Sequence, residues 1–169
     1  MTGLAGTPFK HPACHGNKAF LHELRKATRR LIKKHGKKDP ESPKKIFISR
    51  KNTRRRFSNH SEIESAFERK RFTTVYLEDL SVTQQLKTFE QATHIAALHG
   101  AGLTNLISAR KNTIVLEIFG HEGSHAYQTI SKALGLKYTH LCAIDDEHLN
   151  ADKKASIESI NSAINQMIT

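Results

Sequence analysis

The chain is poor in the residues that mark several classes of protein. Among its 169 residues there are two cysteines, Cys14 and Cys142, and no tryptophan. Two cysteines exclude a disulfide-rich secreted scaffold and make a reducing compartment the default. No apolar run approaches the roughly 18 residues that a membrane-spanning helix needs. Residues 1–10 also lack the basic-then-apolar layout of a signal peptide. These absences predict a cytoplasmic protein.

Acidic residues are scarce in the first third of the chain. Residues 1–56 hold 17 of the 27 Lys and Arg residues but 3 of the 16 Asp and Glu residues. The net charge of +11 therefore arises from this amino-terminal third of the chain. Such a region would meet nucleic acid, an anionic membrane surface or an anionic ligand, with residues 18–35 as the membrane-contacting segment. The alternative is a solvated helix face that follows a basic arm.

Aromatic residues are also few, at 7% of the chain. A nucleic-acid-binding module without catalysis is the alternative function, in which basic residues 18–35 and 49–59 would contact phosphates. The sequence contains no recognised reader motif and little aromatic interleaving. Nucleic acid is therefore the less favoured partner.

The chain does contain a regular alternation of strand-like and helical patterns. Strands are expected over residues 45–49, 72–77, 94–98, 113–118 and 137–141. Helices are expected over residues 18–35, after a capping box at Asn59 or Ser61, after a capping box at Ser81, and over residues 126–134 and 155–167. Several strands are apolar on both faces, which is typical of a mostly parallel sheet covered by helices on both sides. The sequence predicts an α/β, Rossmann-like three-layer domain of about five strands over residues 44–169, preceded by a basic arm and helix over residues 1–43.

A glycine turn follows the strand over residues 94–98. His99 ends the apolar run, and Gly100-Ala101-Gly102 leads into an expected helix start. Glycine has no Cβ, so backbone N–H groups at such a junction can approach an anion. Residues 49–59 begin at the end of the strand over residues 45–49 and contain five cationic side chains. Since ligands bind beyond the carboxyl ends of parallel strands, both segments would reach the same edge. The alternative for residues 49–59 is a solvated basic loop.

Taken together, these segments resemble the carboxyl-terminal part of glycosyltransferase family 61, a group that includes capsular-polysaccharide transferases. The resemblance covers roughly residues 44–141, and its pieces follow the family's order. They are Ser49-Arg50, Arg56 and Asn59 ahead of Glu62, Phe72, Leu80-Ser81 with Gln84 or Gln85, Phe89 and Ala92, the run from His99 to Asn105, Glu117, and Gly135-Leu136-Lys137-Tyr138.

The resemblance implies one half of a GT-B enzyme, in which two Rossmann-like domains face each other across a cleft. The carboxyl-terminal half would bind a nucleotide-diphosphate sugar, and transfer would be inverting, with no metal or other cofactor. The acceptor would be a glycan or a lipid-linked glycan. The family pattern places Arg50 and Arg56 on the donor diphosphate, with His99 beside the leaving phosphate.

The remaining roles implied by the resemblance concern the glycine turn and the strand that follows it. Backbone N–H groups would face the donor from Gly100, Ala101, Gly102 and Leu103. Asn105 would hold the turn or touch the donor, and Glu117 would hydrogen-bond the ribose hydroxyls. From the residues alone, His99 and Asn105 could equally support the turn, and Glu117 could mark the exposed end of a strand.

The chain is shorter than a complete GT-B enzyme, which needs two domains of roughly 100–200 residues each. We therefore expect the second GT-B domain to be absent from this chain, and the general base that deprotonates the acceptor usually comes from that domain. The chain would then be a donor-binding half, a truncated product, or a subunit that needs a partner chain or a second copy. The competing interpretation is a minimal domain that binds a nucleotide sugar and performs no chemistry.

Two clusters resemble metal sites. His121-Glu122-Gly123-Ser124-His125 matches the H-E-x-x-H pattern of zinc proteases, but Gly123 and Ser124 are poor helix formers and that chemistry requires a helix. A loop lining the ligand cleft is the favoured interpretation, with His121 or His125 near the sugar. His11, Cys14 and His15 are a weaker candidate, so no metal site is predicted.

Overall fold

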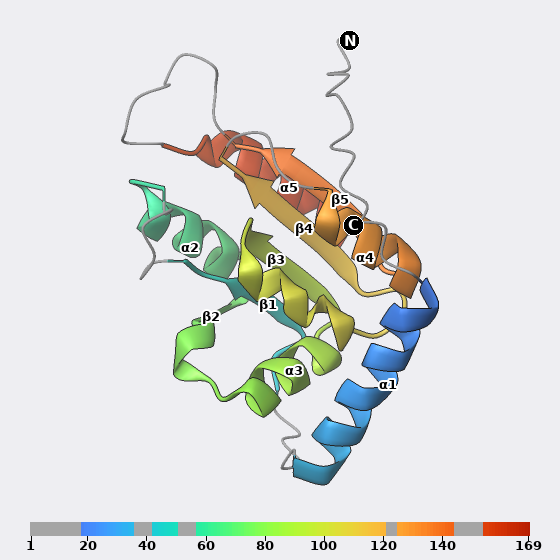
Figure 1. The fold of residues 1–169 in the computed structure, drawn as a ribbon. Helices are drawn as coiled ribbons and strands as arrows, with labels where there is room; N and C mark the ends of the chain where they lie inside the picture. Colours follow the sequence, from blue (N-terminus) through green and yellow to red (C-terminus); the bar gives the residue numbers. More distant parts are fainter. Residues whose placement is uncertain (1–17, 36–41, 51–56, 121–124, 144–153) are drawn as a thin grey trace.

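The computed structural model describes residues 18–35, 42–50, 57–120, 125–143 and 154–169. Within these ranges the chain forms a sheet flanked by helices (Figure 1). The strands are β1 (Lys45–Ile48), β2 (Thr73–Val75), β3 (His94–Leu98), β4 (Ile114–Phe119) and β5 (Lys137–Cys142). The α-helices are α1 (Lys18–His35), α2 (His60–Arg69), α3 (Val82–Gln91), α4 (Ala126–Leu134) and α5 (Ile157–Ile168), and two short 3₁₀ helices are η2 (Leu77–Asp79) and η3 (Ala101–Ile107).

The five strands form one sheet in the order β2-β1-β3-β4-β5, and every neighbouring pair is parallel. The chain moves from β1 to one side to form β2 and then crosses back to form β3. The carboxyl ends of β1 and β3 therefore flank the point at which the strand order reverses, where ligands bind in open α/β sheets. This arrangement confirms the predicted Rossmann-like sheet.

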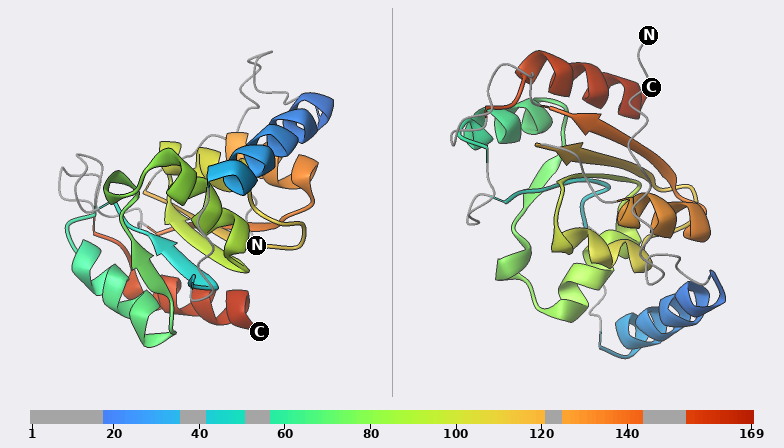
Figure 2. Two further views of the ribbon diagram at one scale, coloured as in Figure 1. Left: turned by 90° about the horizontal axis from the view of Figure 1, so that it is seen from below. Right: turned by 45° about the horizontal axis from the view of Figure 1, so that its top comes forward.

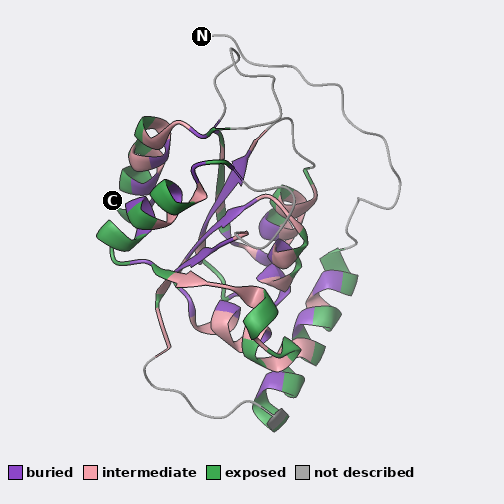
Figure 3. Cartoon of the chain, turned by 90° about the vertical axis from the view of Figure 1, so that its left-hand side faces the viewer, coloured by how far each residue is buried: buried purple, intermediate pink, exposed green. Residues whose placement is uncertain are grey.

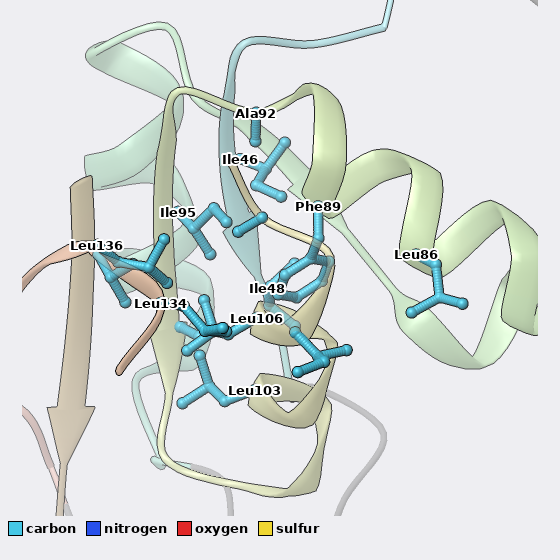
Figure 4. Close-up of a cluster of buried hydrophobic side chains, with 14 of the residues drawn as sticks. Ile46, Ile48, Leu86, Phe89, Ala92, Ile95, Leu103, Leu106, Leu134 and Leu136 are labelled. Atoms are coloured by element: carbon cyan, nitrogen blue, oxygen red, sulfur yellow. The ribbon is translucent and has the colours of Figure 1, made fainter. Parts of the chain in front are cut away.

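Helices cover both faces of the sheet. In Figure 2, left, α2 and α5 lie below the sheet, whereas α3, η3 and α4 lie above it and α1 lies outside them. Alternate residues of each central strand enter opposite cores, because strand side chains alternate between faces. Ile46, Ile95 and Val115 enter the core under α3, η3 and α4, part of which is shown in Figure 4. Phe47, Ala96 and Leu116 enter the core against α2 and α5.

Helix α1 packs on α3, η3 and α4 and does not stand apart as an arm. Leu21 and Ile32 join the core on that side of the sheet. Arg25 is buried between them, and its guanidinium donates hydrogen bonds to the carbonyls of Leu134, at 3.1 Å, and Ala109. The domain boundary after residue 43 stays a prediction, and helix α1, which precedes it, packs on elements that follow it. No helix in the described ranges is both long and apolar enough to cross a bilayer.

Some helix ends follow local signals, whereas the start of α2 follows a tertiary contact. Ser81 and Gln84 form the predicted capping box at α3, and Gly135 ends α4 in the left-handed region, with φ of 71°. Neither predicted capping box forms at α2. Asn59 is the N-cap residue, but its side chain forms two 2.9 Å hydrogen bonds with the backbone of Ala155.

The main differences from the expected elements concern one strand and one helix. The strand expected over residues 72–77 is limited to β2, because Leu77 begins η2. The helix expected after the glycine turn is the 3₁₀ helix η3. Figure 3 shows that burial is concentrated on the central strands and on the inward faces of the helices.

Candidate functional site

The segments that follow β1 and β3 meet at the point where the strand order reverses. Arg50 comes two residues after β1, and its guanidinium donates a hydrogen bond to the carbonyl of His99, the first residue after β3. The guanidinium also occupies the space beside Gly100, where an added Cβ would lie 2.7 Å from Arg50 Cζ. Any larger residue at position 100 would therefore displace Arg50. The predicted pairing of the arginine segment with the glycine turn is present for Arg50, whereas Arg56 lies outside the described residues.

The amides of the glycine turn divide into two groups. Leu103 donates its N–H to the carbonyl of Gly100 at 3.0 Å, so this amide is engaged inside η3 and does not face an anion as predicted. Leu103 is also almost completely buried. Within the described part of the chain, no acceptor is found for the N–H groups of Gly100, Ala101 and Gly102.

Asn105 holds the turn against α3. Its side-chain amide donates to the Gly102 carbonyl at 3.1 Å and to Oε1 of Gln85 at 3.0 Å. Gln85 in turn donates to the carbonyls of Leu77, at 2.8 Å, and Leu80, at 3.1 Å. Of the two roles expected for Asn105, this geometry supports the one in which it holds the turn.

A buried carboxylate on β4 links His99, which follows β3, to Tyr138 near the start of β5. Glu117 on β4 is 0% exposed. Its Oε1 lies 2.5 Å from Nδ1 of His99, and its Oε2 accepts a 2.5 Å hydrogen bond from the hydroxyl of Tyr138 on β5. Burial, and then the neighbouring Glu117 carboxylate, raise the pKa of Tyr138 above its ordinary value, so the phenol stays protonated and donates.

The His99 ring is held in one orientation and remains partly open to solvent. It stacks on Phe119, with ring centroids 4.8 Å apart, and Tyr127 of α4 lies 5.8 Å away. The side chain is 30% exposed. Since Nδ1 is engaged by Glu117, Nε2 is the ring nitrogen left for a ligand; no described residue bonds to it. A carboxylate that accepts from one imidazole nitrogen fixes the tautomer and aims the other nitrogen.

Glu117 was predicted from the sequence as a ribose contact, and Tyr138 was not predicted as a site residue at all. Both oxygens of Glu117 are occupied inside the protein, which favours a role exerted through His99. The signal for Tyr138 was indirect. A glutamate within an apolar strand needs buried donors, and a tyrosine on the neighbouring strand is a candidate donor. In the observed register Tyr138 pairs with Val115 and therefore shares the face of Glu117.

The sequence clusters that resemble metal sites fall mostly beyond the described residues. His11, Cys14, His15 and His121 are all outside them. His125 is exposed at the start of α4, where its Nδ1 lies 3.1 Å from Gln128 Oε1. Among the residues that the structure describes, no group of three or more His, Cys, Asp or Glu side chains is arranged to hold a metal ion.

The fold and the site together define a Rossmann-like domain. Where its strand order reverses, it carries an arginine, a glycine turn and a histidine bonded to a carboxylate. The chain belongs to the glycosyltransferase 61 family, whose sequence profile matches residues 8–116. The match begins earlier than the expected residue 44 and takes in α1. It ends one residue before Glu117, so Glu117 and Tyr138 lie beyond the matched segment.

One relative is a beta-1,2-xylosyltransferase of Arabidopsis thaliana. It is 36% identical to the chain over 63 residues, which is 37% of this chain and 12% of the xylosyltransferase. The aligned part is thus a small portion of the relative.

Proposed function

We propose that this chain binds a nucleotide-diphosphate sugar and serves inverting, metal-independent transfer of its hexosyl or pentosyl group in glycan or polysaccharide synthesis. The observation that carries the proposal is the meeting of Arg50 with the His99–Gly100 turn at the strand-order reversal, in a chain of the glycosyltransferase 61 family. The xylosyltransferase relative supports a pentose as one donor sugar to test.

The chemistry requires charge stabilisation on the departing diphosphate. The bond between the sugar's anomeric carbon and the phosphate oxygen breaks as the acceptor oxygen attacks the opposite face. The phosphate oxygen gains negative charge. Arg50 and Arg56 would bind that charge, and the N–H groups of Gly100, Ala101 and Gly102 would add donors from the turn.

His99 is placed in this proposal beside the leaving phosphate, with Nε2 toward the donor. Glu117 is a positioning residue that holds Nδ1, and Tyr138 positions Glu117. Because Glu117 is completely buried and both its oxygens are engaged, we favour this role over direct contact with the ribose hydroxyls.

We propose that the acceptor-binding surface and the general base lie outside this domain. In the GT-B arrangement a second domain would supply the general base and the binding surface for a glycan or lipid-linked acceptor, from a partner chain, a second copy or another part of the same protein. A cytoplasmic location at the inner face of a membrane suits such acceptors and the basic residues 1–56 of the chain.

Isothermal titration with a panel of nucleoside diphosphates tests the proposal. We expect Arg50→Ala and Arg56→Ala each to weaken the best ligand by about 1.5–3 kcal/mol, the scale of a charge-assisted hydrogen bond. Lys132→Ala, which removes an exposed cation on α4, is the matched control and should leave affinity unchanged.

Two results would contradict the proposal. One is unchanged affinity in both arginine variants. The other is the absence of nucleotide binding together with tight, salt-dependent binding of random duplex DNA, which would favour the nucleic-acid-binding alternative.

A further inference from the structure

Helix α1 carries two apolar stripes, one buried and one exposed. Leu21 and Ile32 face the core and are 7% and 8% exposed. Phe20, Leu24 and Leu31 lie on a neighbouring stripe and are 63%, 40% and 38% exposed. Spacings of four and seven residues place these three side chains along one side of the helix. The helix therefore presents a line of large apolar groups at the protein surface.

Cationic side chains cover most of the remaining surface of α1. Six lysines and arginines of the helix are exposed: Lys18, Lys26, Arg29, Arg30, Lys33 and Lys34. The helix has a single acidic residue, Glu23, which forms a 2.7 Å ion pair with Lys26. The surface thus combines an apolar stripe with a strong excess of one charge.

This combination matches the chemistry of an anionic lipid surface. Apolar side chains enter the boundary between headgroups and acyl chains, while lysines and arginines bind the acidic headgroups. Nucleic acid would satisfy the cations but leave the apolar stripe in water. A protein interface would bury the stripe, but interface cores are poor in charged residues, lysine especially.

The position of α1 keeps the candidate site away from such a surface. Arg25 contacts the carbonyls of Ala109 and Leu134, which precede β4 and β5 along the chain. The helix therefore lies toward the amino ends of the strands. In Figure 1 it occupies the lower right, whereas the arrowheads of β4 and β5 point to the upper left. A domain lying on α1 would keep the Arg50–His99 edge accessible.

We propose that α1 is an interfacial helix that docks this domain on anionic membranes, inserting Phe20, Leu24 and Leu31 and binding headgroups through the surrounding cations. The proposal does not depend on nucleotide binding or sugar transfer, because it concerns a surface remote from the ligand edge.

A single tryptophan tests the insertion, since the chain has none of its own. Leu24→Trp in the full chain should show a blue-shifted emission on adding vesicles of phosphatidylcholine with about one third phosphatidylglycerol. Val82→Trp is the matched control, because Val82 is a 65% exposed apolar residue on α3, and its emission should not change. No shift for Leu24→Trp, or equal shifts for both, would overturn the proposal.

Vesicle flotation separates the apolar and electrostatic contributions. Leu24→Ser with Leu31→Ser should reduce binding about tenfold or more, because two inserted side chains are lost. Arg30→Glu with Lys34→Glu should do the same. The control pair Lys132→Glu with Lys137→Glu makes the same change of charge on exposed residues outside α1 and should retain binding.

The state of the protein and the identity of the partner are checked in parallel. Circular dichroism should show unchanged melting of the variants, because the altered side chains are exposed. Vesicles should leave the affinity for a nucleoside diphosphate unchanged. Equal binding to pure phosphatidylcholine, or binding to duplex DNA but not to vesicles, would contradict an anionic lipid surface as the partner.

Discussion

The two faces of the sheet use the same strands for different purposes. On β4, Leu116 and Ile118 enter the core against α2 and α5, while Glu117 between them enters the opposite face. The first face is packed with aromatic and aliphatic groups, including Phe47 stacked on Phe67 at 4.2 Å. The second face buries Glu117 and surrounds it with donors. A shift of one residue along a strand thus separates a stabilising core from a candidate site.

The difference shows where polar atoms are tolerated in this fold. A buried charge is costly unless it is bonded, and Glu117 has a partner for each oxygen. That requirement is met by His99, which follows β3, and by Tyr138, which lies near the start of β5. The face with α2 and α5 has no Asp, Glu, Lys or Arg among its described buried residues. We therefore expect substitutions on the two faces to separate stability from ligand binding.

The largest effect is expected for Phe67→Ala on the face with α2 and α5. Phe67 is 0% exposed, and it stacks on Phe47 and packs edge-on against Phe72 at 5.2 Å. Loss of the ring should lower the free energy of unfolding by about 3–5 kcal/mol, as measured by urea denaturation. Nucleotide affinity per folded molecule should stay the same. A large change in that affinity would show that the two faces are not separable.

A smaller loss of stability is expected for Tyr138→Phe on the opposite face. The substitution removes a hydrogen bond to a carboxylate and should cost about 1.5–3 kcal/mol at neutral pH. It should also weaken nucleotide affinity in isothermal titration, because Glu117 and therefore His99 lose their orientation. Tyr127→Phe, which leaves Glu117 bonded, is the control. Equal effects of the two substitutions would argue against a positioning role for Tyr138.

The same residue predicts a difference at alkaline pH. The pKa of Tyr138 is raised in the folded protein, so above the ordinary tyrosine pKa of about 10 the unfolded chain loses this proton before the folded chain does. Ionisation then favours unfolding, and stability falls as pH rises. Urea denaturation of Tyr138→Phe should show a shallower decline above this pH than the parent protein. Parallel pH profiles would contradict the burial of a protonated phenol.

The smallest effect is expected at the helix starts. Asn59→Ala removes two hydrogen bonds to the backbone of Ala155 and should cost about 1–2 kcal/mol. Ser81→Ala removes the local capping box of α3 and should cost about 1 kcal/mol. Only Asn59→Ala should also increase hydrogen exchange in α5, because Ala155 lies just before that helix. Unchanged exchange in α5 would show that the hydrogen bonds between Asn59 and Ala155 do not stabilise that helix.

Much of the fold follows from local sequence patterns. Short runs rich in apolar and β-forming residues indicated the strands, and the helical spacing of residues 18–35 matched α1 to the residue. Parallel pairing followed because helices separate successive strands. The glycine turn and the basic segment 49–59 were identified because both follow strands and so reach one edge of the sheet, and the family resemblance then singled out Arg50.

What the sequence did not reveal depends on contacts between distant segments. Asn59 meets Ala155 across 96 residues, and Arg25 meets Ala109 across 84 residues. Tyr138 reaches Glu117 only in the register that the folded sheet adopts. A local pattern records which face a side chain occupies, but it does not record the partner found there.

The contacts of Arg25 bear on the order in which the protein assembles. Its two acceptors lie in the connections that enter β4 and β5, and these connections have their shape only after that part of the sheet has formed. We therefore expect α1 to dock late in folding and to detach first when the native structure opens locally. This strongly basic helix would then dock and detach as one cooperative unit, while the parallel sheet stays assembled.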